Sequence, residues 1–174
     1  MPALTDRLRA EKAADIVRHA GGKVVGKTRL QKMAYLLEIT GLGAGFPFEY
    51  RHYGPYSEEL ADGIAGAYFW DLMSEEEHTA NWGGAYSVFR ASSTAGSARV
   101  NPARREILTL ASKANPISLE LAATAAFLAK ENSRDPWAET SRRKPEKAEK
   151  YLDDAKILYS KLREIKTPKK MPAI

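Results

Sequence analysis

The second half of the chain places a helix-capping residue directly before a proline three times. The side chain of Asn or Asp accepts hydrogen bonds from the first free backbone N–H groups of a helix. Proline suits the next position, where its missing N–H leaves no hydrogen bond unmade. Because proline in a helix interior breaks the helix, each pair marks a boundary, and helices are predicted over 102–114, 116–131 and 136–142. The three pairs are Asn101-Pro102, Asn115-Pro116 and Asp135-Pro136.

Lys144-Pro145 begins the last predicted helix, whose apolar residues recur at intervals of three and four. They are Ala148, Tyr151, Leu152, Ala155, Leu158, Tyr159 and Leu162. Such a spacing places one apolar face along about four turns of helix. This face packs either on the rest of the chain or on a second copy, so the pattern fits a homodimer as well as a monomer.

The net charge of +5 is concentrated at one end of the chain. Residues 1–129 contain 14 Lys or Arg and 14 Asp or Glu, whereas residues 130–174 contain 13 and 8. A basic segment can hold the phosphates of nucleic acid, but the interleaved acidic residues here favour a solvated helix face. We predict that residues 164–174 form a flexible basic tail.

The first half of the chain combines helices with short strands. Apolar spacing predicts a helix over 5–20 and a second helix that starts at Thr28. Gln31 lies three residues after Thr28, which is the pattern of a capping box. Two short strands are predicted around Gly83-Gly84, followed by a mobile loop over 92–97.

Between the second and third helices, residues 46–53 alternate as a half-buried strand does. The predicted inner face holds Phe46, Phe48, Tyr50 and His52, and the outer face holds Pro47, Glu49, Arg51 and Tyr53. Gly54-Pro55 is predicted to end the strand. Ser57 then has the side chain to cap a third helix.

These elements predict one domain over residues 1–174, since this length is typical of a single domain. The fold class is mainly α with a small antiparallel β-sheet, an α+β fold built as a helical bundle. Two helices joined by a short turn, then a third helix followed by two strands, make the N-terminal half winged-helix-like.

Several classes of function lack their sequence signals. There is no cysteine, no run of ~20 apolar residues and no signal peptide, which indicates a cytoplasmic protein without a membrane partner. A phosphate-binding loop, a nucleophile elbow and a zinc-binding pair of histidines are also missing. We therefore expect no cofactor, no metal site and no enzymatic activity.

Histidine is the remaining candidate for catalysis, and the three histidines are isolated in the sequence. His52 is the best of them because three tyrosines and Arg51 surround it. A general base needs a nucleophile or metal within hydrogen-bond reach, and the sequence names none, so a structural role is favoured. His78 follows Glu75-Glu76-Glu77, which favours an acidic turn with a solvated histidine over a carboxylate–imidazole site.

A DNA-binding transcriptional regulator is one hypothesis for the function. A winged helix inserts a basic helix into the major groove, and Lys27, Arg29 and Lys32 cluster at the start of the second helix. However, residues 1–129 are neutral overall, and the third helix opens with acidic residues that repel phosphates. This reading is therefore the alternative, and nucleic acid is the less favoured partner.

Protein binding is the leading hypothesis, because aromatic residues and arginine are the usual anchors of protein interfaces. Residues 50–70 concentrate tyrosine, phenylalanine, tryptophan and arginine. Arg51 and Tyr53, on the outer face of the predicted strand, are expected to stay accessible. The residues thus indicate a non-enzymatic protein-binding module.

Two segments resemble the Panacea domain, the SocA-like antitoxin family, and its YwgA-like relatives. Residues 29–37 match a helix in which leucine is followed by Gln or His, then Lys, and three positions later Tyr or Phe. Residues 48–60 match the strand that leads through Gly-Pro into a helix. A looser match joins residues 119–128 to Lys144-Pro145, so the resemblance covers about residues 28–160.

The resemblance implies a mainly helical fold with a small sheet and a protein partner. In that family the domain neutralises a cognate toxin or delivers a protein to a protease, and many members are encoded in phages or mobile elements. The matching positions here are Leu30, Gln31, Lys32, Tyr35, Tyr53, Gly54, Pro55, Tyr56 and Ser57. Arg51-His52-Tyr53 departs from the Trp and His common before Gly-Pro. Tyr56 replaces a small aliphatic residue, which favours the YwgA-like branch.

Overall fold

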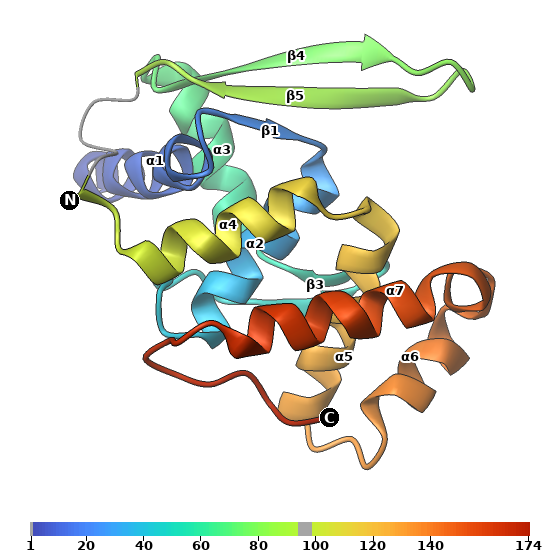
Figure 1. The fold of residues 1–174 in the computed structure, drawn as a ribbon. Helices are drawn as coiled ribbons and strands as arrows, with labels where there is room; N and C mark the ends of the chain where they lie inside the picture. Colours follow the sequence, from blue (N-terminus) through green and yellow to red (C-terminus); the bar gives the residue numbers. More distant parts are fainter. Residues whose placement is uncertain (1, 94–98) are drawn as a thin grey trace.

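The computed structural model describes residues 2–93 and 99–174 and confirms an α+β fold that is mainly α (Figure 1). Its helices are α1 (Pro2–His19), α2 (Lys27–Ile39), α3 (Glu58–Phe69), α4 (Pro102–Lys113), α5 (Pro116–Lys130), α6 (Pro136–Arg143) and α7 (Pro145–Glu164). Its strands are β1 (Lys23–Val25), β2 (Glu49–Arg51), β3 (Gly54–Tyr56), β4 (Met73–Thr79) and β5 (Ala85–Ala91). None of the described helices combines the length and hydrophobicity that crossing a bilayer requires.

The larger sheet has three antiparallel strands in the order β1-β5-β4. With α1, α2 and α3, it has the connectivity of a winged helix: β1 follows the first helix, and the β4–β5 hairpin follows the third. The predicted winged-helix-like half differs in one respect. Residues 40–57, which contain the β2–β3 hairpin, separate α2 from α3 in place of a tight turn.

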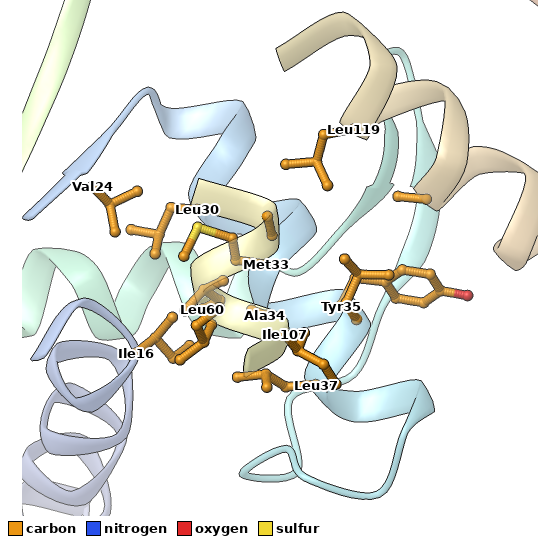
Figure 2. Close-up of a cluster of buried hydrophobic side chains, with 14 of the residues drawn as sticks. Ile16, Val24, Leu30, Met33, Ala34, Tyr35, Leu37, Leu60, Ile107 and Leu119 are labelled. Carbon is orange, nitrogen blue, oxygen red and sulfur yellow. The ribbon is translucent and has the colours of Figure 1, made fainter. Parts of the chain in front are cut away.

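α2 lies at the centre of the molecule, and nine of its thirteen residues are buried. Leu30, Met33 and Leu37 pack with residues from α1, α4 and α5 in one continuous core (Figure 2). The predicted capping box at the start of this helix is wrong. Gly26 is the N-cap without a side-chain hydrogen bond, and Gln31 uses its amide elsewhere because the helix begins a residue before Thr28.

The aromatic segment folds as a hairpin rather than as one long strand. Only Glu49–Arg51 of the predicted strand pairs, and it pairs with Gly54–Tyr56 across a two-residue turn. The prediction that Gly54-Pro55 ends the strand is therefore wrong, since both residues belong to β3. Proline is tolerated there because a strand in a two-stranded sheet has a free edge. The Ser57 cap is confirmed, with its hydroxyl accepting from the N–H of Leu60.

The boundaries predicted from proline in the second half are confirmed. Asn101, Asn115 and Asp135 each accept backbone N–H hydrogen bonds at the start of α4, α5 and α6. α7 packs its apolar face against α5 and α6, which buries Ala155, Leu158 and Leu162 within the chain. This face is therefore not free to form a dimer seam.

The C-terminal segment, predicted to be a flexible tail, instead folds back onto the body. Met171 is buried, the hydroxyl of Tyr159 donates to the carbonyl of Pro172 over 2.6 Å, and the N–H of Lys169 donates to the carbonyl of Thr40. The prediction missed this packing because residues 166–174 show no periodic apolar pattern.

The acidic run before His78 also differs from its prediction. Residues 75–78 lie within β4 rather than in a turn, paired along their length with β5. The ring of His78 stacks on Tyr86, and its Nε2 lies 3.2 Å from a carboxylate oxygen of Glu76. The predicted mobile loop over 92–97 falls mostly outside the described residues.

Candidate protein-binding surface

The residues that carry the two sequence motifs meet at the β2–β3 hairpin. His52 and Tyr53 form its turn, and both are exposed, as is Arg51 beside them. Exposure of Arg51 and Tyr53 matches the prediction. His52 was predicted to face the core, and this is wrong because the strand ends one residue earlier, so that the alternation no longer applies.

Hydrogen bonds from α2 hold the hairpin in place. The side-chain amide of Gln31 donates to the carbonyl of Ser57 over 3.0 Å and accepts from its N–H over 2.8 Å. The ammonium of Lys32 donates to the carbonyl of Pro55 over 2.7 Å. The contacting residues are 23 and 26 positions apart in sequence, so the two motifs are the two halves of one contact.

Lys32 is among the largest fully buried side chains, with 1% of its surface exposed. Among the described residues no carboxylate forms an ion pair with it, and Pro55 is its one hydrogen-bond acceptor. Burial lowers the pKa of Lys32 to about 7, opposed by the charge of Glu120 and reinforced by Lys144 and Lys147. The burial contradicts the reading of Lys32 as a solvated or DNA-facing cation.

Glu120 of α5 organises the other side of the hairpin. Its buried carboxylate lies 2.8 Å from the ammonium of Lys144 and 2.9 Å from that of Lys147. Lys144 in turn donates to the carbonyl of His52 over 2.9 Å. Sequence reasoning missed Glu120, although a single carboxylate within an alanine-rich apolar helix is a signal that it needs a cationic partner.

The hairpin also packs closely on α5 and α2. Gly54 has a φ of +87°, and a Cβ at this position would lie 2.5 Å from the hydroxyl oxygen of Thr124. Tyr35 packs edge-on against Phe48, with ring centroids 5.2 Å apart, and burial raises the pKa of its hydroxyl. Glycine is required because any side chain would push the hairpin from α5.

An open hollow of about 640 Å³ lies between the hairpin and the junction of α6 with α7. Arginines and lysines lie over the tyrosine rings around it. The guanidinium of Arg143 is 4.7 Å from the ring centroid of Tyr50, and the ammonium of Lys147 is 5.0 Å from that of Tyr53. The residues lining the hollow are Tyr50, Arg51, His52, Arg142, Arg143, Lys144, Pro145, Glu146 and Lys147.

The cations of this hollow are paired with carboxylates of the same chain. Arg51 contacts Glu49 and Glu58, and Glu139 pairs with both arginines at the end of α6. Lys144 and Lys147 share Glu120. Because each positive charge has a negative neighbour, the surface offers aromatic and guanidinium faces rather than a field that attracts phosphate.

The three cations predicted to contact DNA do not form one exposed surface. Arg29 donates to the carbonyls of Ala111 and Ala114, so it caps the C-terminal end of α4. Lys27 is exposed and lies 3.6 Å from a carboxylate oxygen of Glu75, whereas Lys32 is buried. α2 is therefore a core helix rather than a solvent-facing recognition helix.

The histidines lie apart from one another. His19 accepts a hydrogen bond from Arg104 at Nδ1, and burial, followed by the charge of Arg104, lowers its pKa. His52 packs edge-on against Tyr53. No group of three or more metal-ligating side chains occurs within residues 2–93 and 99–174.

Neither a scan against protein-family models nor a search of curated proteins found a match to this chain.

Proposed function

We propose that this chain is a cytoplasmic, non-enzymatic protein-binding module, antitoxin-like or adaptor-like, whose partner binds the hollow beside the β2–β3 hairpin. One observation carries the proposal: the hollow is lined by three exposed arginines and the half-buried ring of Tyr50, with the exposed Tyr53 in the hairpin turn beside it. These residue types dominate the binding energy of protein interfaces. The Panacea-like motif positions Tyr53 to Ser57 lie in this hairpin and at its end, which supports the same reading.

The rigidity of the surface adds support. The hairpin is attached from beneath by Gln31 and Lys32 of α2 and from the side by Lys144. A surface that is already ordered loses less conformational entropy when a partner binds. The hollow is thus suited to a partner that presents its own aromatic or apolar anchor.

Replacing Arg51 and Tyr53 together with alanine is expected to weaken partner binding at least about tenfold, as loss of interface anchors does. Both side chains are exposed, so the variant should fold as the wild type does. The partner is sought by capture from the host and by co-expression with the product of the adjacent gene, and its affinity is measured by isothermal titration calorimetry.

Ile157→Ser is a matched control, since Ile157 is an exposed apolar residue on α7 outside the hollow. It should leave the affinity unchanged. The proposal fails if the double alanine variant binds as tightly as the wild type. It also fails if the wild-type chain neither captures a host protein nor binds the neighbouring gene product.

A DNA-binding regulator is the alternative proposal, supported by the winged-helix connectivity of the N-terminal half. The first turn of α3 carries Glu58 and Glu59, and β4 carries three more glutamates. These carboxylates repel the phosphate backbone. We therefore expect no mobility shift of the upstream DNA even at low salt, and a shift that weakens steeply with salt would favour the alternative.

A further inference from the structure

The outer strand of the larger sheet has a free edge. β4 is hydrogen-bonded to β5 on one side, and among the described residues no strand pairs with its other side. Only Met73 of its seven residues is buried. In Figure 1, β4 lies at the margin of the sheet and extends with β5 well past the short β1. Such an edge is a template on which another extended chain can add.

The hydrogen bonds of β5 identify which backbone groups of β4 point outward. The carbonyl of Ser87 accepts from Gly26, and the N–H of Ala91 donates to Gly22, so odd-numbered residues of β5 face β1. Ser87 lies opposite Glu77 in the ladder. In an antiparallel pair, the backbone groups of two opposite residues either bond to each other or both point away from the partner strand. The backbone N–H and C=O of Ser87 point to β1, so those of Glu77 point away from β5. The same holds for its alternate neighbours Glu75 and Thr79.

The charges on this edge indicate which charge an added strand would carry. β4 contains three consecutive glutamates and no Lys or Arg. Glu75 and Glu76 each have a cationic neighbour within the chain, whereas Glu77 has none among the described residues. Opposite charges across neighbouring strands are favourable and like charges unfavourable, so the edge disfavours a second copy of itself.

We infer that the outer edge of β4 binds an extended, Lys- or Arg-rich segment of a partner protein by strand addition. The backbone N–H and C=O groups of Glu75, Glu77 and Thr79 form the ladder, and the glutamate side chains pair with the cations of the added strand. The site is separate from the hollow beside the β2–β3 hairpin, so it does not depend on the proposed function.

The test uses the isotope-labelled full chain and a synthetic peptide as long as β4, with lysine and valine alternating. Addition of this peptide should shift the backbone amide signals of Glu75, Glu77 and Thr79 and slow their hydrogen exchange. A peptide in which glutamate replaces lysine should produce neither change. Arg51→Ala with Tyr53→Ala should bind the lysine peptide as the wild type does, which separates this inference from the proposed function.

Two substitutions at one position separate the backbone contribution from the charge. Glu77→Pro removes the outward N–H but no hydrogen bond to β5, and proline is accepted at strand edges. Glu77→Ala removes the same charge and keeps the N–H. The proline variant should bind the peptide at least about fivefold more weakly than the alanine variant. Thr79→Pro is the substitute if Glu77→Pro does not fold.

Equal binding by the proline and alanine variants would overturn the inference, since charge attraction alone would then explain the affinity. Equal binding of the glutamate peptide would overturn it as well. If the wild type dimerises in sedimentation experiments and the Glu77→Pro variant is monomeric, the edge binds a second copy of the chain instead.

Discussion

Glu120→Ala is expected to lower the free energy of unfolding by about 3–5 kcal/mol, the usual effect of removing one partner from a buried ion pair. Glu120 is 4% exposed, and its carboxylate lies 2.8 Å from the ammonium of Lys144, which is also buried. Without it, Lys144 and the nearby Lys32 remain in the interior without a compensating charge. Urea unfolding at neutral pH, followed by circular dichroism, measures the change.

Two variants test whether charge is the cause. Glu139→Ala removes a carboxylate that also pairs with two cations, but at the surface, where ion pairs contribute little, so its effect should be much smaller. Replacing both Glu120 and Lys144 with methionine removes both charges and should recover much of the lost stability. An equal loss in the Glu120 and Glu139 variants would contradict the assignment.

Stability is expected to rise by about 3 kcal/mol between pH 7 and about pH 9.5 because of Lys32 alone. The pKa of this lysine is about 7 in the folded protein, compared with 10.5 in an unfolded chain. Between these values the unfolded chain holds the proton and the folded protein has released it. Raising the pH therefore favours folding through this window. Below pH 7 Lys32 is protonated in both states, and the stability that its deprotonation contributes is lost.

The two groups with the nearest shifted pKa values, His19 and Tyr35, titrate outside this window. The lowered pKa of His19 acts below its ordinary value of 6.5, and the raised pKa of Tyr35 acts above 10. Lys32→Met should remove the rise, because methionine fills similar space without a charge. Lys27→Met, in the exposed first turn of the same helix, should keep the rise. Parallel pH curves for the wild type and Lys32→Met would show that Lys32 is not the cause.

The sequence predicted the helix boundaries well because local chemistry decides them. A capping side chain followed by proline acts through hydrogen bonds within one turn and through the fixed φ of proline. Asn101, Asn115 and Asp135 therefore behave as expected whatever packs around them. The Ser57 cap is similarly local.

Strand pairing was predicted less well because it depends on residues far apart in sequence. The alternation of residues 46–53 indicated a strand, but only pairing with β3 sets where it ends. The glutamates of β4 read as a turn, and they form a strand because β5 supplies the ladder along their whole length. β-propensity reflects such context more than the residues themselves.

Local patterns in the sequence were enough to predict an α+β class, seven helices in order and the exposed residues Arg51 and Tyr53 beside a glycine and proline. Which cations remain available in the described part of the chain depends on how the helices pack. Lys32 looks like a surface lysine in sequence, but α2 passes through the centre of the core and buries it under the hairpin. Glu120 and Lys144 become partners only because α7 packs against α5. Burial and charge pairing are properties of the folded arrangement, since they depend on which surfaces exclude water from one another.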